Sequence, residues 1–147
     1  MTLPLPLNLF RIEATFHPEN IGVSGAPLLT YSGDITPDRE VSVPAGIALI
    51  VFNLNTSPSS PIKALFQTSP VQWFETQLDG TNSRVPTLLP DMFMFQRIGD
   101  TTVTLLDFNS NQLNSDFDKN HWFNLVLSYD GATYGSDPMI INEPPVG

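Results

Sequence analysis

The feature that most constrains this chain is an apolar run, Ile47 to Phe52, which contains no polar or charged residue. The run is short and rich in β-branched residues, and turn-forming residues flank it, so it favours a strand over a helix. Successive side chains of a strand point to opposite faces, so both faces of this strand are apolar. We therefore predict a central strand that is covered on both faces, and a second copy of the chain is one way to supply a cover.

The segment before this run predicts a tight turn. Val43-Pro44-Ala45-Gly46 suits a type I turn, with proline at the second position and glycine at the fourth. We expect the turn to join a strand over residues 39–43 to the strand over residues 47–54, and these two strands to pair closely.

Alternation of apolar and polar residues predicts two further half-buried strands. Residues 8–16 place Phe10, Ile12, Ala14 and Phe16 on one side, and residues 121–129 alternate in the same way before Asp130-Gly131 closes the strand. Shorter strands are predicted at residues 28–32, 39–43, 71–76, 92–98, 101–108 and 139–142. Residues 62–67 form either a strand or a short helix, and Thr68-Ser69-Pro70 divides them from residues 71–76.

Length and composition indicate one all-β domain. A chain of 147 residues is the size of a single domain, here residues 1–147, and 14 prolines and 9 glycines suit many short strands joined by turns. Such strands bury their apolar faces best in two packed sheets. We predict a two-sheet antiparallel β-sandwich that is immunoglobulin-like or cupredoxin-like.

The charge of the chain excludes several partners. Fifteen acidic residues against six basic ones give a net charge of -9, so neither nucleic acid nor an anionic membrane surface is expected to bind. The chain has no cysteine, its first residues lack the pattern of a secretory signal, and no segment has the length of a membrane span. We expect a cytoplasmic protein whose acidity keeps it soluble.

The carboxy-terminal residues resemble those of a known family. Asp137-Pro138 and Glu143-Pro144 follow a last aromatic strand, and this pattern resembles the small bacterial DP-EP family, which is named after such dipeptides. The resemblance implies a compact β-sandwich of unassigned function. From the residues themselves, we expect Asp137-Pro138 to stand at the start of the last strand and Glu143-Pro144 to end it.

One loop carries the oxygen ligands of a calcium site. Asp107, Asn109, Asn111 and Asp118 fall at several of the positions that a calcium-binding loop uses. However, Gln112 stands where the loop requires glycine, and strands are predicted on both sides. The favoured interpretation is therefore a hairpin loop whose polar side chains hydrogen-bond to the backbone of the same loop.

Other metal chemistry is limited by the small number of ligands. Asp116, Asp118 and His121 lie close enough in sequence to gather a metal ion, although acids beside a strand are usually solvated. A blue-copper site requires a cysteine, which the chain lacks, and His17 and His121 are its only histidines. We expect no cofactor.

Two alternatives concern ligands and catalysis. Trp73 and Trp122 each adjoin an aromatic neighbour and could form the platform of a carbohydrate-binding module, but burial in the sandwich is the favoured interpretation. Asp34 with Asp38 could form the carboxylate pair of a hydrolase. The sequence contains no nucleophile elbow, phosphate-binding glycine loop or metalloprotease helix, so we predict that the protein is not an enzyme.

These patterns do not assign a specific function. The prediction they favour is a noncatalytic β-sandwich that binds or assembles, most simply by self-association through one sheet face or an edge strand.

Overall fold

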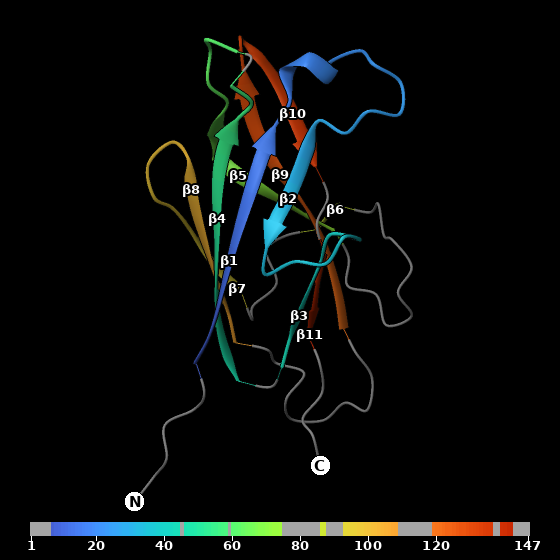
Figure 1. Cartoon of the computed structure of the whole chain (residues 1–147). Coiled ribbons are helices and arrows are strands. Elements are labelled where there is room, and N and C mark those ends of the chain that lie inside the picture. The colour runs from blue at the N-terminus through green and yellow to red at the C-terminus, as the bar shows by residue number, and fades with distance from the viewer. Residues whose placement is uncertain are drawn as a thin grey trace, which may run out of the picture.

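Two β-sheets packed face to face make up the part of the chain that the computed structural model describes, residues 7–44, 46–58, 60–74, 86–87, 93–108, 119–136 and 139–142 (Figure 1). The first sheet has the strand order β2-β1-β4-β8-β7. Its strands are β1 (Leu7–Phe16), β2 (Leu29–Gly33), β4 (Ile47–Thr56), β7 (Phe93–Arg97) and β8 (Thr102–Asp107). A 3-10 helix, η1 (Pro18–Asn20), follows β1.

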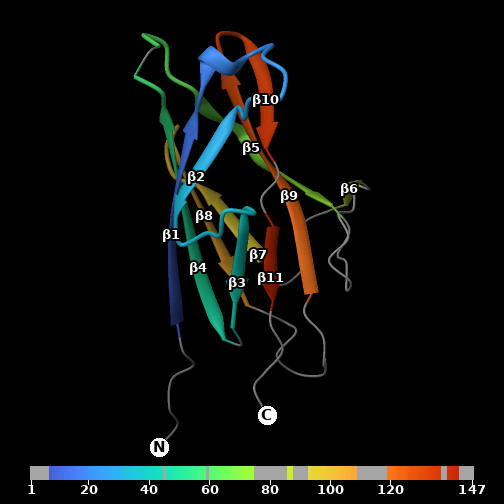
Figure 2. The same cartoon turned by 45° about the vertical axis from the view of Figure 1, so that its right-hand side comes forward.

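The second sheet has the strand order β3-β11-β9-β5-β6, and β10 also pairs with β9. Its strands are β3 (Glu40–Val43), β5 (Leu65–Phe74), β6 (Pro86–Thr87), β9 (Lys119–Tyr129), β10 (Ala132–Ser136) and β11 (Met139–Asn142). Figure 2 shows the two layers, with β1 and β4 in one and β3, β11 and β9 in the other. The prediction of an all-β, two-sheet sandwich is confirmed.

Both sheets are mixed, whereas antiparallel sheets were expected. β1 runs parallel to β4 from the pair Leu7 and Ile47 to the pair Phe16 and Thr56, and β3 runs parallel to β11. The other pairings are antiparallel. The parallel pair arises because the chain descends along β2 and β3 and then ascends along β4, in the direction of β1 (Figure 1).

The predicted pairing of β3 with β4 is wrong. β3 pairs with β11 in the second sheet, while β4 pairs with β1 and β8 in the first. Val41 and Val43 on β3 and Ala48 and Ile50 on β4 are all buried in the core between the sheets. The short connection after β3 therefore carries the chain across the core from one sheet to the other.

The strand order can be compared with that of an immunoglobulin domain. An immunoglobulin domain has the sheets A-B-E-D and C-F-G, in which the first strand lies at an edge. Here β1 lies inside its sheet, between β2 and β4. The order of the first sheet therefore differs from the immunoglobulin order.

The core consists of the inward-facing side chains that the alternation predicted. Ile12, Ala14 and Phe16 on β1 are fully buried, and Phe123 on β9 packs against Phe52 with ring centroids 5.9 Å apart. The other buried apolar side chains include Ile50, Leu54, Val103, Leu105, Leu125, Leu127 and Ile140. Burying one such large side chain contributes about 1.5–3 kcal/mol, so this alternation supplies the main stabilisation of the sandwich.

Two elements differ from the sequence-based expectation. Residues 65–74 form one strand, β5, with no helix, and its register with β9 shifts between Phe66 and Val71, because Pro70 has no N-H to donate to a ladder. β10 was not predicted. It forms a hairpin with β9 through Asp130 and Gly131, whose φ values of 47° and 79° suit a type I′ turn.

Candidate functional site

The outer face of the first sheet is only partly covered by the described residues. Along β4, Ala48, Ile50 and Phe52 face the core and are buried, whereas Leu49 and Val51 on the other face are half-buried. The prediction that this strand is central is confirmed. The prediction that both its faces are fully covered is not, because the described part of the chain buries only the inner one completely.

A row of apolar side chains crosses this outer face. Leu9 on β1 pairs in register with Leu49 on β4, Leu49 with Leu106 on β8, and Leu106 with Met94 on β7. Leu9 is 49% exposed and Met94 is 59% exposed. The row ends in a groove of about 420 Å³, which is lined by Leu49, Met94, Phe95, Gln96, Thr104 and Leu106. None of these groove residues carries a charge.

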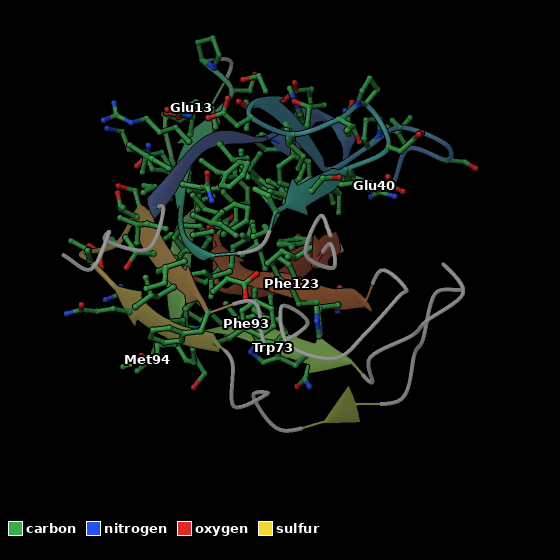
Figure 3. The ribbon with its side chains drawn as sticks, turned by 90° about the horizontal axis from the view of Figure 1, so that it is seen from below. Glu13, Glu40, Trp73, Phe93, Met94 and Phe123 are labelled. Carbon is green, nitrogen blue, oxygen red and sulfur yellow. The ribbon has the colours of Figure 1, made fainter. Side chains whose placement is uncertain are left out.

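The row and the groove end at β7, the edge strand of the sheet among the described residues. Phe95 on β7 is 36% exposed, and Ile98 just after it is 51% exposed. Figure 3 shows Met94 at the outside of the ribbon, whereas Phe93 from the same strand lies between the sheets near Trp73 and Phe123. Because side chains alternate along a strand, Met94 and Ile98 make an exposed apolar outer side, whereas Phe95 lies on the same side as the buried Phe93.

The pairing of β7 with β8 shows which backbone groups of β7 point away from β8. The N-H of Ile98 donates to the carbonyl oxygen of Thr102 at 2.7 Å, so these two residues form a hydrogen-bonded pair. Bonded pairs alternate along an antiparallel ladder, so Gln96 and Met94 also bond to β8. It follows that Phe93, Phe95 and Arg97 point their N-H and C=O groups away from β8.

Within the strand itself, residues 93–97, the β7 edge has no lysine, proline or bulge of the kind that usually protects an edge strand. Proteins block such edges with lysine, proline, bulges or very short strands. The one charge on β7 is Arg97 at its end, which is engaged with Asp100 and donates from Nε to the carbonyl oxygen of Phe66 at 3.3 Å. By contrast, β3 begins with Glu40 and is four residues long, and β6 is a two-residue strand that contains Pro86.

A polar network bounds the apolar row on the same face. The Glu13 carboxylate accepts hydrogen bonds from Asn53 Nδ2 at 3.2 Å and from Asn55 Nδ2 at 2.8 Å, and Thr102 Oγ1 donates to Asn53 Oδ1 at 3.0 Å. These polar groups therefore serve as hydrogen-bond partners for one another. The network marks where the apolar part of the face ends.

The structure places Trp73 in the core. Its side chain is 3% exposed, and its ring stacks on Phe93 with centroids 4.6 Å apart and lies 5.1 Å from Phe123. The favoured prediction, burial, is confirmed for Trp73, which offers no platform to a sugar. The side chain of Trp122 lies outside the described residues.

Asp107 and His121, from the predicted metal-binding segments, are both fully buried. Asp107 ends β8 and pairs in register with Phe93, and the ring of His121 on β9 meets the ring of Phe93 edge-on at 5.0 Å. One polar side chain comes from each sheet, and both have interaction partners.

The remaining predicted site residues divide into two groups. Asp34 belongs to the turn after β2, where its Oδ2 accepts the backbone N-H of Arg11 at 2.8 Å, and Asp38 lies exposed in the next turn. The others lie outside the described residues: Asn109, Asn111, Asp116, Asp118, Asp137, Pro138, Glu143 and Pro144. Among the residues that are described, no three His, Cys, Asp or Glu side chains gather closely enough to hold a metal ion.

Comparison with known proteins adds no relative. No family model matches the chain, and no curated protein has a matching sequence. The resemblance to the DP-EP family therefore stays a prediction. Within the described ranges, no helix combines the length and the apolar character that crossing a bilayer requires.

Proposed function

We propose that the protein is a noncatalytic assembly module that self-associates by pairing β7 of one copy with β7 of another. The observation that carries this proposal is the edge of β7, which pairs with no described strand other than β8 and has the outward backbone groups of Phe93, Phe95 and Arg97 and the exposed side chains of Met94 and Phe95. An edge of this kind is a template for adding another strand.

A two-fold axis beside Phe95 satisfies the geometry of such a pair. Antiparallel pairing about this axis places Phe95 opposite Phe95 of the other copy and Phe93 opposite Arg97 of the other copy. These are the residues whose N-H and C=O groups point outward, so each forms a hydrogen-bonded pair across the axis. On the outer face, Met94 of one copy lies opposite Gln96 of the other copy and diagonally across from Met94 of the other copy. The apolar rows of the two sheets are thereby joined.

Charge favours a second copy of this chain as the occupant of the edge. Two copies that each carry a net charge of -9 repel one another, so they approach best through a surface without acids. The groove beside β7 is such a surface, since all of its lining residues are uncharged. A basic partner would instead be attracted to the acidic remainder of the molecule.

The substitution Phe95→Lys tests this proposal. It places two lysines opposite each other at the two-fold axis and removes two aromatic side chains, so we expect dimerisation to weaken by roughly thirtyfold or more. Sedimentation velocity over a range of protein concentrations measures this effect, in about 0.15 M salt, where the Debye length is about 8 Å.

Ser32→Lys is the matched control, because it adds the same charge to β2, the opposite edge of the same sheet, at an exposed position. We expect this control to associate as the unchanged protein does. Equal association of all three proteins, or a strictly monomeric unchanged protein at the highest concentration, would contradict the proposal.

A further inference from the structure

The side chain of Met94 is the most exposed member of the apolar row. The chain contains four methionines and no cysteine, so thioethers are its only sulfur groups. Met94 is the one methionine whose side chain belongs to the described part of the chain, and it is 59% exposed at the outside of the ribbon (Figure 3). A thioether exposed to this degree is open to oxidants that are dissolved in water.

The neighbours of Met94 across the sheet are apolar. Met94 pairs in register with Leu106, and Leu106 pairs with Leu49, and these three residues contribute to the lining of the groove beside β7. Leucine thus supplies the apolar surface at every other position of the row, Leu9 included. What methionine adds at the last position is a sulfur atom, which a single oxygen atom converts from an apolar to a polar group.

Met94 is also the residue at which the apolar rows of two paired copies meet. Each Met94 lies diagonally across the two-fold axis from Met94 of the other copy, and such diagonal neighbours are about 7–8 Å apart, within reach of long side chains. A sulfoxide oxygen placed there has to keep its hydrogen bonds to water. Gln96, the residue directly opposite, is exposed, so its amide already has water as a partner and gains little from the sulfoxide.

We propose that Met94 is an oxidation site whose sulfoxide weakens the pairing of β7 with a second copy. The effect on pairing rests on the proposed function, whereas the oxidation itself depends only on the exposure of the side chain. The oxidant is a hydroperoxide such as hydrogen peroxide. The sulfur donates an electron pair to one peroxide oxygen, the O-O bond breaks, that oxygen stays on the sulfur, and the other oxygen leaves as water with both protons. The sulfur loses two electrons and the peroxide gains them.

Reduction returns Met94 to its apolar form. Two thiols supply two electrons and two protons, the S-O bond breaks, the oxygen leaves as water, and the thiols form a disulfide. Because the chain has no cysteine, the thiols come from a separate dithiol reductase. A modification that is reversed in this way makes self-association responsive to peroxide.

Mild treatment of the full chain with hydrogen peroxide tests the proposal. Peptide mass spectrometry measures the sulfoxide fraction at each methionine, and sedimentation velocity measures the association of the same sample. We expect Met94 to be oxidised and dimerisation to weaken by roughly tenfold, and we expect methionine sulfoxide reductase with dithiothreitol to restore it. Met94 should also oxidise more slowly as the protein concentration rises, because pairing covers its side chain.

Two substitutions assign the effect to Met94. Met94→Leu removes the thioether and keeps an apolar side chain of similar volume. Each protein is compared with itself before and after peroxide, and we expect Met94→Leu to associate equally in both states. Met92→Leu is the matched control, because it removes a thioether from the same stretch of sequence and leaves Met94 in place. Peroxide should weaken the association of this control as it does that of the unchanged protein.

Three results would overturn the proposal. The first is a Met94 that stays a thioether while the other methionines are oxidised. The second is complete oxidation of Met94 with association that is unchanged or tighter, and the third is an equal loss of association in Met94→Leu. An unoxidised protein that is monomeric at every concentration contradicts the proposed function together with this effect, whereas dimerisation that survives complete oxidation of Met94 contradicts only the effect of oxidation.

Discussion

Replacing Gly33 by alanine is expected to lower the free energy of unfolding by about 3 kcal/mol or more. Gly33 ends β2 with a φ of 96°, and a Cβ at this position would overlap the carbonyl oxygen of Arg11. Arg11 cannot move aside, because its carbonyl oxygen accepts the N-H of Asp34 at 2.9 Å and its own N-H donates to Asp34 Oδ2 at 2.8 Å. The alanine must therefore break these bonds or shift β2 away from β1.

Gly99→Ala is the matched control for this prediction. Gly99 also has a positive φ, of 72°, but a Cβ there would meet no atom within 4 Å. Only the backbone strain remains, so we expect a loss of about 1 kcal/mol. Urea denaturation of both variants measures the difference. Equal losses would show that β1 and β2 are not held together as closely as described.

Truncating Phe123 to alanine is expected to destabilise the sandwich by about 3–5 kcal/mol, a large part of the 5–15 kcal/mol that is typical of a whole domain. Phe123 is fully buried, and its ring contacts both Phe52 from the opposite sheet and Trp73 from its own. Two rings pack against it from different sheets, so the structure cannot easily close the cavity that alanine leaves.

Phe108→Ala provides the comparison, because Phe108 is 37% exposed and follows the end of β8. We expect this variant to lose about 1 kcal/mol or less. The measurement is again denaturation by urea, with the slope of the transition as a check that both variants unfold in the same way. A loss at Phe123 no larger than that at Phe108 would contradict the packing of the two sheets around this ring.

The sequence was informative about individual strands and less so about how they pair. Alternation located β1 and β9, because a half-buried strand needs apolar side chains at every second residue, and the buried Ile12 and Phe123 confirm it. The pairing of β3 with β4 was wrong, since the turn between them is compatible with both a hairpin and a crossing between sheets. The parallel pair of β1 and β4 joins segments about 40 residues apart, which local patterns do not specify.

The candidate site was harder to predict for the same reason. The apolar row consists of Leu9, Leu49, Leu106 and Met94, which lie on four strands and meet only once the register of the sheet is set. A weak signal was present in the run Met92 to Gln96, which lacks any charge.

The most direct test of self-association through β7 is hydrogen exchange of its backbone amides at high and low protein concentration. We predict that the amides of Phe93, Phe95 and Arg97 are protected at high concentration and lose this protection on dilution, because their hydrogen bonds cross to the second copy. The amides of Met94 and Gln96, which bond to β8, should stay protected throughout. If Phe93, Phe95 and Arg97 exchange at the same rate at every concentration, β7 does not pair with a second copy.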